Sequence, residues 1–209
     1  MNAADVFRQE GAEIRCFDLP FTEYAISSYY LIACAEASSN LARYDGIRYG
    51  HRSDSATNLS DLYIRNRSQG FGPEVKNRIL LGTYVLSEGY YDEYYKKALS
   101  AKELIKNSFR KVFEDFDVLL TPTAPTTAPK KGNSLKDPIK MYLQDAYTVS
   151  SNLAGLPALS IPCGLNNNGM PIGMQIIGKA FDDEKVLSIG YKFQQLTSFH
   201  NLKPGGAST

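Results

Sequence analysis

Two short apolar runs near the C-terminus, joined by four turn-forming residues, constrain the fold more than any other feature. Residues 158–163 and 172–177 have the length and composition of strands. Residues 166–169, with the sequence NNNG, supply the positive φ angles that a tight turn requires. The sequence therefore predicts a β-hairpin in a chain that is otherwise rich in helical patterns.

The remaining pattern predicts mainly helices. Apolar spacing indicates helices at the following ranges: 3–10, 22–43, 72–86, 90–116, one or two within 139–154, and a last one from 181. Alternation over 12–19 and the apolar run 117–121 indicate two further strands. Residues 46–58 and the proline-rich stretch 122–138 are expected to be loops, and the tail after Pro204 is expected to fray.

Composition excludes several classes of protein. The 209 residues are 43% hydrophobic and 22% charged, as in a folded soluble domain. The 23 basic residues balance the 22 acidic ones, so the chain lacks the charge expected for nonspecific nucleic-acid binding. Three scattered cysteines and two histidines provide neither a zinc-ligand spacing nor a disulfide scaffold, which predicts a reducing compartment. No apolar run is long enough to span a membrane, and no signal peptide is expected.

A search for catalytic motifs finds none that is complete. The serine-hydrolase motif GxSxG, the Walker phosphate loop and GxGxxG are absent. His51 lies in an arginine-flanked loop and His200 near the C-terminus, so neither is expected to act as a general base. Cys34 and Cys163 are expected to be small core residues rather than nucleophiles. The residues alone therefore indicate an α/β piece without a full active site.

Two charged residues nevertheless lie where apolar neighbours are expected. Arg78 falls on the apolar face of the predicted helix 72–86, and Asp145 shares a helical stripe with Tyr142 and Val149. A guanidinium and a carboxylate facing one cavity would bind the two poles of an α-amino acid. The alternative is that Arg78 extends to solvent and that Asp145 caps a helix beginning at Ala146. Spacing alone leaves both interpretations open.

Five stretches resemble one family of proteins. They are AEASSNLARYDGIRYG at 35–50, EVKNRILLGTYVL at 74–86, DVLLTPTAP at 117–125, NLAGLP at 152–157 and PIGMQIIG at 171–178. Together they are similar to the C-terminal part of the A subunits of glutamyl-tRNA(Gln) amidotransferases (GatA), a branch of the amidase signature family. The last three stretches are shared widely across that larger family, whereas the first is much more particular to the GatA branch.

The resemblance implies an activity and a set of partners. It implies a glutaminase that works in a heterotrimer with the GatB and GatC subunits of the amidotransferase. Ammonia would pass to GatB, where misacylated Glu-tRNA(Gln) is amidated during protein biosynthesis. GatB would use ATP and Mg²⁺ and would hold most of the tRNA, whereas this chain would bind no cofactor or metal. The cytoplasm is the expected compartment, or else an organellar matrix or stroma.

The resemblance also assigns residues. Arg78 matches the arginine that binds the α-carboxylate of glutamine, Asp145 matches the aspartate that binds its α-amino group, and Tyr29 or Tyr30 matches a pocket tyrosine. Cys34 stands where relatives are expected to have proline. Family members use a Ser–cis-Ser–Lys triad in a Gly/Ser-rich segment, and no such segment occurs in the 209 residues. The paired serines at 38–39 and 150–151 lie in other settings, so no catalytic residue is assigned.

The fold implied is the C-terminal portion of one amidase domain, covering residues 1–209. It would be an α/β fold with a mixed sheet flanked by helices on both sides, and it would expose apolar surface where N-terminal strands are missing. The chain is expected to be inactive alone. Two alternatives stay open: another amidase-signature hydrolase acting on a different amide, or a truncated non-catalytic assembly module.

Overall fold

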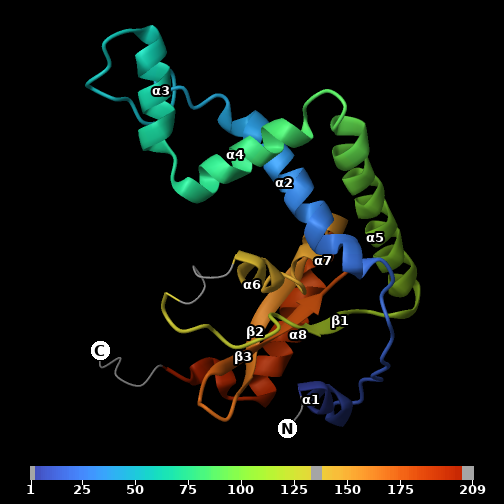
Figure 1. The fold of residues 1–209 in the computed structure, drawn as a ribbon. Helices are drawn as coiled ribbons and strands as arrows, with labels where there is room; N and C mark the ends of the chain where they lie inside the picture. Colours follow the sequence, from blue (N-terminus) through green and yellow to red (C-terminus); the bar gives the residue numbers. More distant parts are fainter. Residues whose placement is uncertain (1–2, 133–137, 204–209) are drawn as a thin grey trace. The chain divides into compact units, whose positions relative to one another are not determined.

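The computed structural model describes residues 3–132 and 138–203, whose helices and strands are drawn in Figure 1. The predicted tail after Pro204 lies outside the described residues. The helices are α1 (Ala3–Gln9), α2 (Ala25–Leu41), α3 (Leu59–Gly70), α4 (Pro73–Val85), α5 (Lys96–Asp115), α6 (Pro138–Leu143), α7 (Val149–Ala154) and α8 (Asp183–Leu196). The strands are β1 (Leu119–Pro122), β2 (Ala158–Leu165) and β3 (Pro171–Ile177).

The chain divides into two compact units, which are described separately. The sheet unit comprises Met1–Ile26 and Lys102–Thr209, and the helical unit comprises Ser27–Ala101. The helical unit is therefore an insertion between two segments of the sheet unit.

The predicted hairpin is confirmed as β2 and β3 of the sheet unit. The two strands pair antiparallel, and Gly169 in the turn has a φ of 74°. The side-chain oxygen of Asn166 accepts hydrogen bonds from the backbone N–H groups of Asn168 and Met170, at 2.9 Å each. This asparagine fixes the turn, as Asx turns do, by replacing a backbone acceptor with its own amide.

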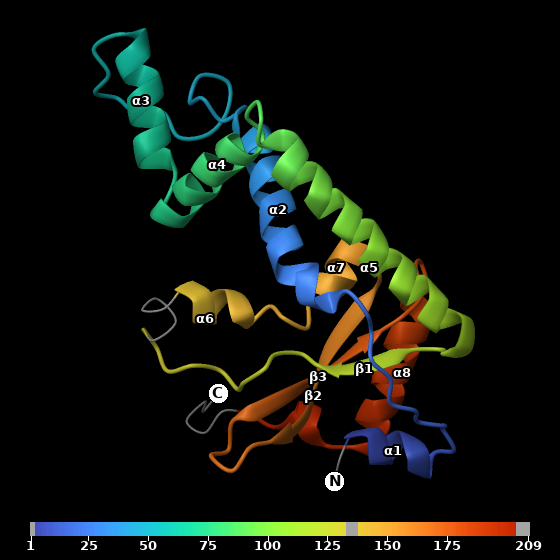
Figure 2. The same cartoon turned by 45° about the vertical axis from the view of Figure 1, so that its right-hand side comes forward.

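The sheet has three strands in the order β1–β3–β2, and both pairs are antiparallel. The α/β class is confirmed, but the sheet within the described residues is antiparallel rather than mixed. Helices α1 and α8 pack on one face through Phe7, Phe193 and Ile176 (Figure 2). On the other face, the amide of Gln175 donates to the carbonyl of Tyr147 at 2.9 Å, which holds the segment before α7 against β3.

The strand predicted over residues 12–19 is wrong. These residues have no strand assignment and pair with none of the described strands. Their alternation reflects side-chain packing alone, because Phe17 stacks on Phe116 of the sheet unit with 5.0 Å between ring centroids. An alternating pattern needs only an apolar surface on one side of the segment, whereas a β-strand also needs a neighbouring strand to which its backbone can hydrogen-bond.

The helix predictions are confirmed with small changes of boundary. Residues 90–116 form a π-helical turn, Tyr91–Tyr95, that continues into α5. The range 139–154 forms α6 and α7, which are separated by a turn, and residues 46–58 form the predicted loop.

Candidate functional site

Arg78 lies on α4 of the helical unit. The helix begins with Pro73 in its first turn, where proline needs no hydrogen-bond donor. The Nε of Arg78 donates to Oε1 of Glu74 at 3.1 Å, and the side chain of Arg78 is 42% exposed. A glutamate four residues before an arginine is the favourable orientation for an ion pair on a helix. This spacing is visible in the sequence, although no role for Glu74 was predicted from it.

Close contact between α4 and α2 positions Arg78. A Cβ atom on Gly82 would collide with the backbone carbonyl of Cys34, so only glycine allows this approach. The hydroxyl groups of Ser38 and Thr83 share a hydrogen bond of 2.9 Å across the same contact. Because Arg78 lies one turn before Gly82, its guanidinium stands beside α2, where it interacts electrostatically with Tyr30 and Cys34.

The electrostatics around Arg78 fix the charge states of its neighbours. Desolvation acts to lower the pKa of Arg78, but the hydrogen bond and charge of Glu74, together with smaller effects of Cys34 and Tyr30, outweigh it, and the net shift is upward. Burial raises the pKa of the Cys34 thiol, and the nearby charge of Arg78 opposes that rise only in part. Arg78 is thus a permanent cation and Cys34 a neutral thiol, which is unsuited to nucleophilic attack.

Tyr29 and Tyr30 both lie on α2 and are half-buried. Their rings meet edge to face, with centroids 5.1 Å apart and an interplanar angle of 79°. Of the two, Tyr30 interacts electrostatically with Arg78. The structure therefore brings Tyr30, Glu74 and Arg78 together in the helical unit, and a contact of either tyrosine with substrate stays a prediction.

Asp145 belongs to the sheet unit, in the turn between α6 and α7, and is half-buried. Its backbone carbonyl accepts hydrogen bonds from the N–H groups of Thr148 and Val149, at 3.0 and 3.1 Å. The alternative interpretation, that Asp145 caps a helix beginning at Ala146, is wrong, because α7 begins at Val149 and Thr148 precedes it. The joint action of Asp145 and Arg78 on one ligand stays a prediction.

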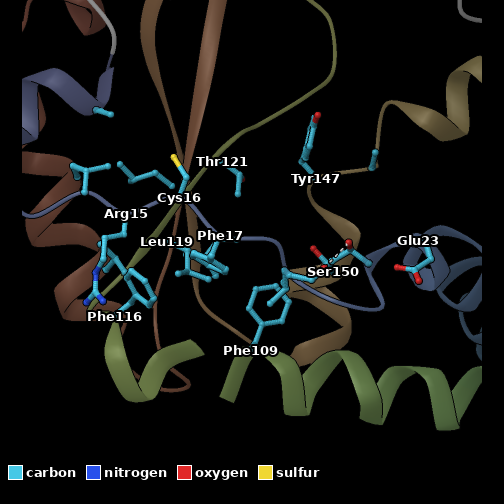
Figure 3. A pocket seen from close by; sticks show the side chains of 18 of the residues that line it. Arg15, Cys16, Phe17, Glu23, Phe109, Phe116, Leu119, Thr121, Tyr147 and Ser150 are labelled. Carbon is cyan, nitrogen blue, oxygen red and sulfur yellow. Dashed lines mark hydrogen bonds between the residues drawn. The ribbon is translucent and has the colours of Figure 1, made fainter. Parts of the chain in front are cut away.

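The sheet unit contains a cavity of about 740 Å³ that the sequence did not indicate. Figure 3 shows Phe17, Phe109 and Phe116 around it, together with Tyr147 and Ser150. Its aromatic walls arise where the irregular segment 12–19 lies along β1 and α5. Neither Arg78 nor Asp145 is among the residues that line it.

Residues 3–132 and 138–203 contain neither a cluster of metal-ligating side chains nor a membrane-spanning helix. No group of three His, Cys, Asp or Glu side chains there could hold a metal ion. None of the helices described is long and apolar enough to cross a membrane.

Comparison with known proteins places the chain in a family. Residues 1–187 match the family model named Amidase. The chain belongs to the amidase family. It is 57% identical over 193 residues to the glutamyl-tRNA(Gln) amidotransferase A subunit of Agathobacter rectalis, covering 92% of this chain and 38% of that protein. It is 58% identical over 205 residues to the corresponding protein of Thermoanaerobacter pseudethanolicus, covering 97% and 42%.

Solved structures share the fold of this chain. The crystal structure of the glutamyl-tRNA(Gln) amidotransferase A subunit from Thermotoga maritima matches with a TM-score of 0.63 and 38% identity, covering 88% of this chain and 35% of that chain. A 6-aminohexanoate cyclic dimer hydrolase matches with a TM-score of 0.72 but only 17% identity, covering 97% and 41%, and so shares the fold. The chain spans about two fifths of the length of its curated relatives.

Proposed function

We propose that this chain is the glutamine-recognition part of a glutamyl-tRNA(Gln) amidotransferase A subunit. The whole enzyme would hydrolyse glutamine and use the ammonia to convert Glu-tRNA(Gln) to Gln-tRNA(Gln). The observation that carries the proposal is Arg78, which the α2–α4 contact holds beside Tyr30 as a permanent cation. High identity to relatives that bear this name supports the same assignment.

Arg78 would bind the α-carboxylate of glutamine with two parallel hydrogen bonds, which a guanidinium can form and an ammonium cannot. An exposed helical ion pair contributes only about 0.3–0.5 kcal/mol, so a ligand carboxylate can replace Glu74 at small cost. Asp145 would accept hydrogen bonds from the α-ammonium group. The amide of the bound glutamine would then be attacked by a serine that belongs to the remaining part of the enzyme.

The partners follow from the same proposal. GatB and GatC, the B and C subunits, would complete the complex, and GatB would hold the tRNA and use ATP with Mg²⁺. This chain would bind glutamine and no cofactor, and it would release no ammonia from glutamine on its own.

The substitution Arg78→Lys in the full-length enzyme tests the proposal. Loss of the bidentate contact should cost about 1.5–3 kcal/mol, which corresponds to a rise of roughly 10- to 150-fold in the KM for glutamine. Arg110→Lys is the matched control, since Arg110 is exposed on α5 and bonds only to Asn107 among the contacts described. An unchanged KM in the Arg78 variant would refute the assignment.

A second measurement separates this function from that of another amide hydrolase. The full-length enzyme should prefer glutamine to simple amides that lack the α-amino and α-carboxylate groups, because those groups are what Arg78 and Asp145 would recognise. Equal activity on both substrates would favour a different amidase. An assembly module without catalysis would be favoured if the full-length protein showed neither activity.

A further inference from the structure

A buried polar side chain interrupts the central strand of the sheet. Gln175 of β3 is 4% exposed, and its neighbours in the strand, Met174 and Ile176, are apolar and belong to the core that α1 and α8 cover. Because side chains alternate between the two faces of a strand, Gln175 points to the opposite face, toward the segment before α7. A buried amide lowers stability unless it is hydrogen-bonded, so its partners show what it holds in place.

The amide group of Gln175 donates two hydrogen bonds. Its nitrogen donates to Oγ1 of Thr121 at 3.0 Å and to the backbone carbonyl of Tyr147 at 2.9 Å. Thr121 of β1 is the cross-strand partner of Gln175 in the sheet register, so its hydroxyl group lies beside the amide and sets the orientation of the amide. Thr121 and Tyr147 both line the cavity of the sheet unit (Figure 3). The amide therefore joins three segments: β3, β1 and the turn that contains Tyr147.

The turn that this amide binds is closed by hydrogen bonds of its own. The carbonyl of Asp45's counterpart in this turn, Asp145, accepts from the hydroxyl group of Thr148 at 3.2 Å, in addition to the two backbone N–H groups described above. The N–H of Asp145 donates to the carbonyl of Tyr142 at 3.1 Å. These bonds fix the backbone from Tyr142 to the start of α7. Because Tyr147 lies two residues from Asp145 in this closed turn, a shift at Tyr147 displaces Asp145 as well.

Apolar burial does not anchor this turn to the sheet. Residues 143–148, all of which the structure describes, are half-buried or exposed, and burial begins with Val149 in α7. Another hydrogen bond to the turn, from Oγ1 of Thr126 to Oε1 of Gln144 at 3.2 Å, lies at the exposed surface, where water competes with it. The bond from Gln175 starts from a buried side chain, and a hydrogen bond that is shielded from water is electrostatically stronger. The position of the turn on the sheet thus depends mainly on Gln175.

We propose that Gln175 is a positioning residue for substrate recognition: through the carbonyl of Tyr147 it sets the place of Asp145, and with it the fit of the site to the α-ammonium group of glutamine. This inference rests on the proposed function, in which Asp145 accepts hydrogen bonds from that group. Gln175 acts through the turn and not by contact with substrate. A displaced carboxylate weakens recognition of the ammonium group, and it leaves recognition of the substrate carboxylate and attack on the amide to other residues.

The experiment compares two substrates of the full-length enzyme. One is glutamine, and the other is glutaramate, which is glutamine without its α-amino group. We define the amino preference as kcat/KM for glutamine divided by kcat/KM for glutaramate. Gln175→Met keeps the length of the side chain but removes its N–H donors. It should lower the amino preference about tenfold by raising the KM for glutamine, with changes of less than about twofold in kcat and in kcat/KM for glutaramate.

Further variants separate positioning from stability. Thr121→Val removes the hydroxyl group that orients the amide and should lower the amino preference about threefold, whereas Thr121→Ser keeps the hydroxyl group and should keep the preference of the wild type. This pair decides the question if Gln175→Met does not fold. Gln195→Met is the matched control, because it makes the same substitution at an exposed position of α8 and should leave both substrates unaffected.

Equal losses of kcat/KM on both substrates in Gln175→Met would overturn the proposal, because a purely structural role gives that result. An unchanged amino preference would overturn it as well, and so would equal preferences in Thr121→Val and Thr121→Ser. The variant Asp145→Asn reports separately on the proposed function. If it lowers the amino preference but Gln175→Met does not, only the positioning role is wrong. If Asp145→Asn has no effect, the role of Asp145 in the proposed function is wrong, and the positioning role fails with it.

Discussion

The sheet unit and the helical unit are stabilised by different interactions. Among the described residues, the largest fully buried side chains of the sheet unit are Phe109, Phe193, Ile105, Ile176 and Ile177, whereas those of the helical unit are Val85 and Cys34. The helical unit relies instead on the close approach at Gly82 and on the hydrogen bonds of Asn66. Apolar burial tolerates repacking, whereas these polar and steric contacts depend on single residues.

The largest loss of stability is expected from a substitution that removes a large side chain from the core of the sheet unit. Phe193 is 1% exposed and its ring lies 5.5 Å from that of Phe7. Phe193→Ala should lower the free energy of unfolding by about 3–5 kcal/mol, as measured by urea denaturation. Leu187→Ala on the exposed side of α8 is the control and should change little. A loss below about 1 kcal/mol would contradict the central place given to this residue.

The second largest loss of stability is expected at the close contact between α2 and α4. Gly82→Val should destabilise the helical unit by about 3 kcal/mol, because the new side chain meets a backbone carbonyl that cannot rotate away. Hydrogen exchange should accelerate in α2 and α4 and stay unchanged in β3. Gly72→Ala, where a Cβ atom meets open space, should have little effect. Equal exchange rates in wild type and Gly82→Val would show that the helices are not held this closely.

A smaller loss is expected from the polar centre of the helical unit. Asn66→Ala leaves the carbonyl of Asp45 and the N–H of Ser53 without their partner, at a cost of about 2 kcal/mol. The measurement is proteolysis within loop residues 43–52, which should become faster. Ser68→Ala on the exposed face of α3 should not change that rate.

The smallest effect is a dependence on pH. The backbone N–H of Arg48 first, and that of Ile47 next, hold the pKa of Asp45 below its ordinary value. The ionised carboxylate of Asp45 therefore stabilises the folded loop. This stabilisation is present above about pH 4 and is lost as the pH falls through the pKa that Asp45 has in the folded protein. Hydrogen exchange in loop residues 43–52 should rise beyond its intrinsic trend as the pH falls below about 4. Asp45→Asn should abolish that extra rise, and its persistence would assign the effect to another group.

The sequence predicted those parts of the molecule that depend on periodicity. The hairpin, α5 and α8 follow from regular apolar spacing and a clear turn signal. The prediction for residues 12–19 failed because alternation describes side chains and carries no information about a backbone partner. The sequence indicated Arg78 as a candidate binding residue because a cation on an apolar helix face is unusual. The roles of Glu74 and Asn66 depend on contacts between particular atoms, which the sequence does not contain. The pairing of Arg78 with Asp145 rests on resemblance and remains a prediction.

The insertion of the helical unit between two segments of the sheet unit affects how the protein folds. Strand β1 and helix α1 come from opposite sides of the insertion, so the sheet unit closes only after the whole intervening segment has been synthesised. Closing a long loop costs less entropy when its interior is already compact. The contacts of the helical unit join residues that are near one another in the sequence, so this unit can fold first. It would then act as a folding nucleus, because its compact form shortens the loop that separates the two segments of the sheet unit.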